Sequence, residues 1–219
     1  MPRNLTHFHH SSGCIGLGNN AQFHERSSNK HKYCFDLALN HIQRMDNNIQ
    51  TYFDVAAGSG KTYLLVKKRW PKIRAWLNDW DKVAFELLKV NYPEAKITQL
   101  DLSAPIKLKE TMDLIWVDFN TFTLLKSNIY CWDNLRNFYE RSKWLAFCDT
   151  ACYAFHLNKK SYGFESLEAY YRELARLITG KSENLYCVYY HKDSSVVVVG
   201  HAKFDSFLKR VTKIGGFQF

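Results

Sequence analysis

One short segment of this chain has residue types and spacing that could do chemistry. An apolar run ending at Asp54 passes into a turn of small residues containing Gly58 and Gly60, and a helical pattern starts immediately after it. Glycines let a ligand approach the backbone closely, and the unpaired N–H groups of a helix N-terminus favour electron-rich groups. The segment therefore predicts a nucleotide-binding turn between a strand and a helix.

Acidic residues also follow the next predicted strands. Asp79 comes about 20 residues after Gly60, the spacing at which a carboxylate after the second strand binds ribose hydroxyls. Asp101 follows the third strand, and Asp118 follows the fourth, whose continuous apolar run is typical of a parallel strand buried on both faces. These strands are expected at residues 73–77, 96–100 and 112–117. Because open α/β sheets bind ligands beyond the carboxyl ends of their strands, the acids belong to one predicted site.

Helices and a terminal hairpin are expected to position this edge. Apolar spacing predicts helices at residues 29–46, 62–70, 82–92, 133–143 and 167–178, and a fifth strand at 144–148. The third helix has Asp81 available as its N-cap and is expected to turn one apolar face toward the core. That face comprises Val83, Ala84, Leu87 and Leu88. Two further runs, 185–190 and 196–201, flank five residues and predict a β-hairpin.

Length and composition limit the classes of protein. A chain of 219 residues is predicted to be one domain at 29–219, preceded by a flexible, basic and His-rich arm at 1–28. Six scattered cysteines and the lack of an 18-residue apolar run predict a cytoplasmic protein with no membrane span, and no metal site is expected. The net charge of +9 suggests a polyanionic partner, with nucleic acid the first candidate, and six basic residues between 61 and 74 could form part of its surface. The oligomeric state cannot be read from the sequence.

Two cofactors compete for the glycine turn. A P-loop requires G-x-x-x-x-G-K-[ST], and Gly60, Lys61 and Thr62 supply its end, but Val55 stands in place of the first glycine. The pattern D-x-A-x-G-x-G at 54–60 instead resembles the first loop of class I S-adenosylmethionine (SAM)-dependent methyltransferases. The order of the later strands and acids is similar to that family over about residues 29–204.

This resemblance implies a fold and a cofactor. The fold is α/β and Rossmann-like, with a seven-stranded, mostly parallel sheet, an antiparallel C-terminal hairpin and helices on both faces. The cofactor is SAM, with the turn against its methionine moiety, Asp79 on the ribose, and Asp101 with Leu102 on the adenine. The implied cofactor-binding residues are Asp54, Ala56, Gly58, Gly60, Asp79, Asp101 and Leu102. Alanine at position 56 departs from the more usual glycine but is also small.

The tip of the fourth strand should identify the methylated group, and here the motifs are incomplete. Methyltransferases acting on adenine or cytosine amines resemble one another in a D/N-P-P-Y/F tetrad, whereas residues 118–121 read D-F-N-T. Ribose 2′-O-methyltransferases are similar in a Lys-Asp-Lys-Glu set, in which Asp118 fits and Lys32 and Lys159 are loosely placed for the lysines, but a glutamate in the last strands is missing. No cysteine lies at this tip, which disfavours covalent attack on a pyrimidine. The modified atom stays open.

In-line methyl transfer needs an acceptor lone pair aligned with the methyl carbon, so positioning supplies much of the rate. Asp118 could orient or deprotonate the acceptor, and Asn120 could hydrogen-bond it. The candidate substrate-binding residues are Phe119, Phe122 and Lys159, with the phenylalanines stacking on a base. The leading hypothesis is a SAM-dependent methyltransferase acting on RNA or DNA. The alternatives are a small-molecule methyltransferase, a non-catalytic methyltransferase fold that binds nucleic acid, and a P-loop NTPase.

Overall fold

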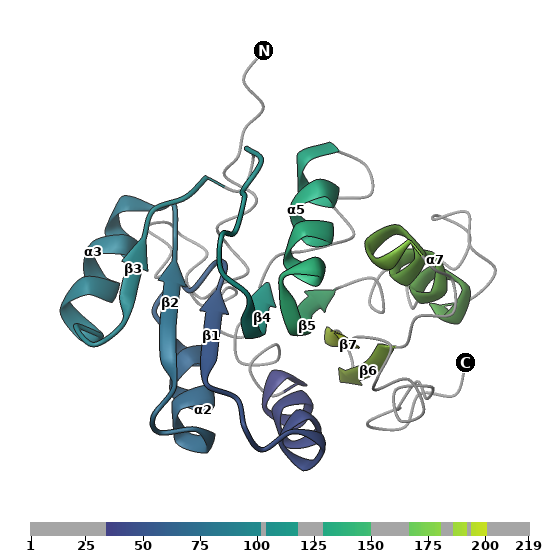
Figure 1. Cartoon of the computed structure of the whole chain (residues 1–219), viewed down its shortest axis with the longest axis horizontal. Coiled ribbons are helices and arrows are strands. Elements are labelled where there is room, and N and C mark those ends of the chain that lie inside the picture. The colour runs from purple at the N-terminus through teal and green to yellow at the C-terminus, as the bar shows by residue number, and fades with distance from the viewer. Residues whose placement is uncertain are drawn as a thin grey trace.

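The computed structural model describes residues 34–101, 104–117, 129–149, 167–180, 186–191 and 194–200. Strands and helices alternate along most of this part of the chain (Figure 1). A helix at residues 34–45 comes first. The remaining elements are β1 (Thr51–Asp54), α2 (Lys61–Arg69), β2 (Arg74–Asn78), α3 (Lys82–Asn91), β3 (Lys96–Thr98), β4 (Met112–Val117), α5 (Ile129–Glu140), β5 (Ser142–Asp149), α7 (Leu167–Thr179), β6 (Tyr186–His191) and β7 (Ser194–Gly200).

The strands form one seven-stranded sheet in the order β3-β2-β1-β4-β5-β7-β6. Strand β1 pairs in parallel with β2 on one side and with β4 on the other, and β5 is parallel to β4. Strand β7 lies between β5 and β6 and is antiparallel to both. The predicted α/β, Rossmann-like architecture, with a mostly parallel sheet and an antiparallel C-terminal pair, is confirmed.

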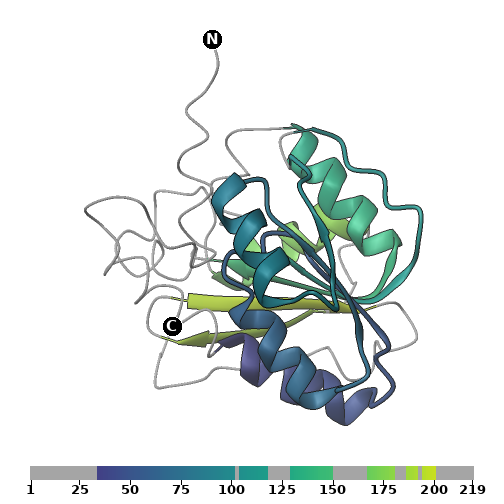
Figure 2. The ribbon, with the colours of Figure 1, turned by 90° about the vertical axis from the view of Figure 1, so that its left-hand side faces the viewer.

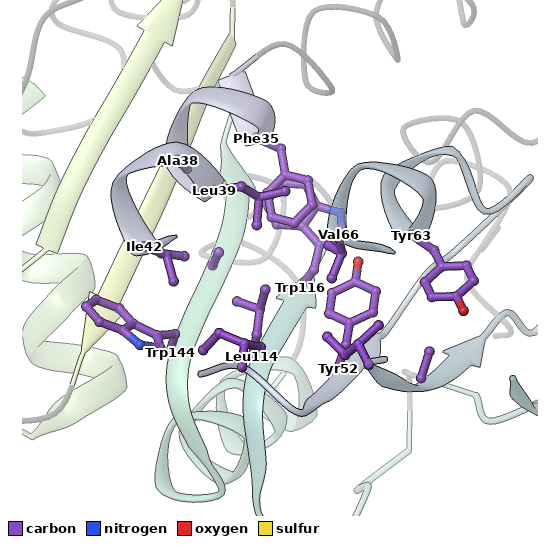
Figure 3. Close-up of a cluster of buried hydrophobic side chains, with 14 of the residues drawn as sticks. Phe35, Ala38, Leu39, Ile42, Tyr52, Tyr63, Val66, Leu114, Trp116 and Trp144 are labelled. Atoms are coloured by element: carbon purple, nitrogen blue, oxygen red, sulfur yellow. The ribbon is translucent and has the colours of Figure 1, made fainter. Parts of the chain in front are cut away.

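Helices cover both faces of the sheet (Figure 2). On one face, the helix at 34–45 and α2 bury their apolar sides against the strands, forming the main core cluster (Figure 3). Trp116 of β4 stacks on Phe35 of the first helix, with ring centroids 3.9 Å apart. The labelled side chains of this cluster are Phe35, Ala38, Leu39, Ile42, Tyr52, Tyr63, Val66, Leu114, Trp116 and Trp144. On the opposite face, α5 packs on the sheet, and Phe138 meets Phe53 of β1 edge to face.

A basic residue joins the two helices of the first face. The Arg69 guanidinium at the end of α2 pairs with the Asp36 carboxylate at 2.9 Å and also donates to the Asn40 side chain. Its side chain is mostly buried, so these partners satisfy a charge that water cannot reach freely. This contact fixes the helix at 34–45 against the helix that follows the glycine turn.

The connection from β3 to β4 has no helix in its described residues, 99–101 and 104–111. A crossover between parallel strands usually contains one. Here the connection is held on α5 by side-chain amides. Asn134 accepts from the Ile106 N–H at 2.7 Å and donates to the Ala104 carbonyl at 2.9 Å, and Asn137 accepts from the Leu108 N–H at 3.2 Å.

Three sequence expectations need correction. Helix α5 begins at Ile129 rather than at 133. The prediction of a five-residue hairpin connection is wrong, because strand pairing continues to His191 and Ser194. The hydrogen bonds of a β-ladder come from the backbone and do not require apolar side chains. On α3, Ala84 and Leu88 are buried as expected, but Val83 and Leu87 are exposed. None of the described helices is long and apolar enough to cross a bilayer.

Candidate functional site

The carboxyl ends of three neighbouring strands meet at the glycine turn. The Val55 N–H donates to the Trp116 carbonyl at the end of β4 at 2.9 Å. The Ala57 N–H donates to the Asn78 carbonyl at the end of β2 at 2.8 Å. Because β2 lies on one side of β1 and β4 on the other, the turn is at the point where the chain changes direction across the sheet. In open α/β sheets, ligands bind at this point.

The backbone of the turn requires its glycines. Gly58 and Gly60 have φ angles of 54° and 74°, which side-chain-bearing residues rarely adopt. A Cβ on Gly60 would lie 2.2 Å from the ring of Tyr92, which follows α3. The Tyr92 hydroxyl donates to the Ser59 carbonyl at 3.1 Å. Burial, and then the nearby Glu94 carboxylate, raise the pKa of Tyr92, so the phenol stays protonated and keeps this donor.

Asp79, the predicted ribose ligand, holds the turn in place. One carboxylate oxygen accepts from the Gly58 N–H at 2.8 Å, and the other accepts from the Asp81 N–H at 3.0 Å. The side chain is almost fully buried. Asp81 itself caps α3 by accepting from the Ala84 N–H at 2.9 Å, which confirms the predicted N-cap. Asp79 therefore has a structural role at the turn.

Asp54 lies beneath the turn, beside α2. Its Oδ2 accepts from the Tyr52 hydroxyl at 2.9 Å and from the Thr62 hydroxyl at 2.6 Å, and the residue is fully buried. In a P-loop, the hydroxyl at the place of Thr62 would bind Mg²⁺. Here it is hydrogen-bonded to a carboxylate. This contact and the sheet order do not support the P-loop alternative.

Asn78, which no sequence motif identified, joins the ends of three strands. Its side-chain NH₂ donates to the Val55 and Leu100 carbonyls at 2.9 and 3.1 Å. Its side-chain oxygen accepts from the Thr98 hydroxyl at 2.9 Å and from the Leu100 N–H at 2.7 Å. A buried amide at the end of an apolar strand, just before an acid, is the sequence signal that could have identified it.

The accessible part of the turn is small and uncharged. Ala56 and Ser59 are partly exposed, whereas Gly58 and Gly60 are buried. Helix α2 begins after Gly60, has no side-chain cap and has no acid in its first turn. Its N-terminal N–H groups therefore leave a positive partial charge next to the turn, which suits a carboxylate or another electron-rich group.

The remaining predicted site residues divide between described and undescribed parts of the chain. Asp101 follows the end of β3 and is exposed, and Asn78 holds the preceding Leu100 against β2. The residues outside the described ranges are Leu102, Asp118, Phe119, Asn120, Phe122 and Lys159. Their roles stay predictions.

The basic run from 61 to 74 is only partly available to a partner. Lys67 pairs with Glu94, and Arg69 pairs with Asp36. The hydrogen bond from Lys67 lowers the pKa of Glu94 and keeps that carboxylate ionised. The basic residues of this run with no ion pair in the described part of the chain are Lys61, Lys68, Lys72 and Arg74.

Comparison with known proteins bears on the fold. No protein-family model and no curated protein match this sequence. Among solved structures, the plantazolicin methyltransferase BpumL in complex with S-adenosylhomocysteine (SAH) aligns with a TM-score of 0.60 and 10% identity, over 88% of this chain and 95% of that chain. Its complex with a pentazolic desmethylPZN analog and SAH aligns with the same TM-score at 9% identity, also over 88% and 95%.

Other matches are less complete. The Streptomyces venezuelae protein DesVI aligns with a TM-score of 0.47 and 13% identity, over 57% of this chain and 53% of that chain. The match thus spans about half of DesVI, and about half (54%) of the sugar N-methyltransferase KedS8. At such identities, a structural likeness establishes the fold. The resemblance seen in the sequence is confirmed at that level, and this chain has the fold of the class I SAM-dependent methyltransferases.

Proposed function

We propose that this protein is a SAM-dependent methyltransferase that binds its cofactor beyond the carboxyl ends of β1, β2 and β3. The observation that carries the proposal is the glycine turn at the centre of the sheet. The buried Asp79 and Asn78 side chains hold its backbone in one conformation, through Gly58 and Val55 respectively. A turn fixed in this way, at the switch point of a sheet of this order, supports a nucleotide-like ligand.

The residues present fit SAM. The uncapped N-terminus of α2, with no acid in its first turn, would hold the carboxylate of the methionine moiety. Partly exposed Ala56 leaves space beside the turn, Asp79 would accept from the ribose, and Asp101 would bind the adenine. Bound SAM supplies an electrophilic methyl group on a sulfonium. Asp118 would orient or deprotonate the acceptor, and Asn120 would hydrogen-bond it.

Nucleic acid is the proposed substrate, and the cytoplasm the proposed location. The net charge of +9 supports a polyanionic acceptor, as do the basic side chains between 61 and 74 that have no ion pair with a described residue. Phe119, Phe122 and Lys159 are the candidate substrate contacts.

A peptide or small-molecule acceptor is the second candidate. It is favoured by BpumL, which was solved with desmethylPZN analogs and aligns over most of this chain. A fold that binds nucleic acid without transferring methyl groups is the third candidate.

The test is calorimetric titration with SAM and SAH, followed by transfer of a labelled methyl group from SAM into RNA, DNA and a peptide mixture. We expect saturable binding that Asp101→Ala weakens. Asp79→Ala is a poorer probe, because it would also release the Gly58 N–H. Absence of SAM and SAH binding would overturn the proposal. SAM binding with labelled methyl groups only in peptide would favour the second candidate, a peptide acceptor. SAM binding without any methyl transfer would favour the third candidate, a fold that binds nucleic acid without catalysis.

A further inference from the structure

The outer strands of the sheet display an aromatic ring between two cations. The guanidinium of Arg74 lies 5.9 Å from the Trp76 ring centroid, and the Lys96 ammonium lies 5.7 Å from it. Trp76 and Lys96 are direct partners in the register of β2 and β3, so this arrangement is set by the backbone ladder. Arg74 and Lys96 are exposed, and Trp76 is partly exposed.

This group lies on the side of the sheet away from the main core cluster. Ala75 and Leu77 alternate with Trp76 along β2 and belong to that cluster, so the Trp76 ring points to the other face. The connection from β3 to β4, which could have placed a helix there, contains none in its described residues. The two exposed cations therefore lie on the α5 side of the sheet, where no described helix follows β3.

Neither cation is neutralised within the described part of the chain. Asp113 on β4, which is separated from β2 by β1, directs its carboxylate to the Gln50 and Thr51 N–H groups instead. A cation held over a ring but lacking a carboxylate is preorganised for an external anion, because the ring restricts the side chain without cancelling its charge. Two such cations on neighbouring strands match the repeated charges of a phosphate backbone.

The group also lies close to the candidate cofactor site. Trp76 lies on β2, and Asp79 comes directly after the end of that strand. Each residue of a strand adds about 3.3 Å along its axis. A chain crossing Trp76 would thus reach the carboxyl edge within roughly 10 Å, a length of only a few nucleotides.

We propose that Arg74 and Lys96, held by Trp76, bind the phosphate backbone of a single-stranded nucleic acid. This inference deepens the proposed function, because it identifies a surface that would lead the substrate to the methyl-transfer site. Arg74 and Lys96 contact phosphates, and Trp76 keeps both side chains extended. The partner is recognised by charge and spacing, so RNA and DNA of the same length bind here alike.

The test is fluorescence anisotropy of the full chain with labelled U and dT oligonucleotides of about 20 nucleotides, long enough for roughly 4–16 nucleotides of contact. Arg74→Gln and Lys96→Gln are each expected to weaken binding roughly fivefold to tenfold near ~50 mM salt, and together to reduce the salt slope by about 1.4. Trp76→Leu is expected to weaken binding about two- to fivefold with little change in slope.

The matched control is the cation–ring pair on α3. The Lys89 ammonium lies 5.0 Å from the Phe85 ring centroid and also pairs with the Glu86 carboxylate at 3.2 Å. Lys89→Gln therefore removes the same charge and the same type of ring contact at a place where the chain itself supplies an anion. This variant should bind as wild type does. Equal losses in Lys89→Gln and Arg74→Gln would overturn the proposal, as would wild-type affinity for the oligonucleotides in the double variant. If poly-glutamate competed with the oligonucleotides equally well, the surface would be assigned to an acidic protein, and the proposal would also be overturned.

Two further measurements separate this inference from the proposed function. SAM titration on the same variants should match wild type, because none of the substituted residues lies at the turn. If oligonucleotides do not bind wild type at all, the inference fails while SAM binding still supports a methyltransferase. Thermal unfolding of each variant excludes loss of fold as the cause.

Discussion

Two glycines share a backbone conformation but have very different surroundings. Gly60 has φ 74° and lies against the Tyr92 ring, whereas Gly180 after α7 has φ 76° and no atom of the described residues within 4 Å of an added Cβ. A side chain in this conformation costs about 1–2 kcal/mol at either position. Only at Gly60 does the contact with the ring add to that cost.

We therefore expect Gly60→Ala to destabilise the protein more than Gly180→Ala, by about 1–3 kcal/mol. We also expect Gly60→Ala alone to weaken SAM binding, because Tyr92 or the turn must move. Urea unfolding and calorimetric titration of both variants check this. Equal free-energy losses in the two variants would show that Tyr92 does not restrict the turn.

At the scale of residues, local chemistry was predictable and long-range contacts were not. Asp81 was predicted as an N-cap because its residue type and its position before a helical pattern suffice. Tyr92 reaches Ser59 across a large sequence separation, and no pattern along the chain specifies that contact. The contacts of Asn78 were not predictable for the same reason, since its partners come from the ends of two other strands, β1 and β3.

The connection from β3 to β4 depends on side chains of α5 rather than on a helix of its own. Asn134 makes two hydrogen bonds to this connection, and Asn137 makes one longer bond. Asn134→Ala leaves the buried Ile106 N–H without its partner, so we expect a loss of about 2–3 kcal/mol. For Asn137→Ala we expect about 1 kcal/mol.

Amide hydrogen exchange would locate these effects. Asn134→Ala should speed exchange at residues 104–108 and leave β1 and β2 unchanged. Similar exchange in Asn134→Ala and wild type would mean that the connection is fixed by other contacts.

Helix α3 has two apolar faces, and the periodicity of the sequence could not tell which one is buried. Leu88 is fully buried, whereas Val90 is 77% exposed. Leu88→Ala should cost about 2–5 kcal/mol through the cavity that it leaves. Val90→Ala should change stability by less than about 0.5 kcal/mol. Chemical denaturation of both variants checks this, and comparable losses would place Val90 in an interface.

The alternation of strands and helices predicted the α/β architecture because period 2 and period 3.6 are properties of each segment alone. The helix-free connection between β3 and β4 was not predicted, since it depends on contacts with α5, far along the chain. The order of the sheet came from the resemblance, because strand pairing across long separations leaves little trace in local sequence.

For the whole molecule, a ligand that binds only the folded state must raise its stability. At about 100 times its Kd, SAH should add about 2.7 kcal/mol. For a chain of this size, that corresponds to a rise in Tm of roughly 5–10 °C. Differential scanning fluorimetry with SAH, and with ATP as the comparison ligand, checks this. A rise in Tm with ATP but not with SAH would indicate that the glycine turn binds phosphate.

The position of β7 has a consequence for synthesis on the ribosome. Of the described strands, β7 is made last, yet it lies between β5 and β6 in the sheet. Until it emerges, β5 presents an open edge of unpaired backbone groups, and open edges promote pairing between chains. The nascent chain can therefore form β1 to β5 early but cannot close its sheet. Strand β7 itself carries four consecutive valines, so its late arrival also limits the time for which this aggregation-prone segment is exposed.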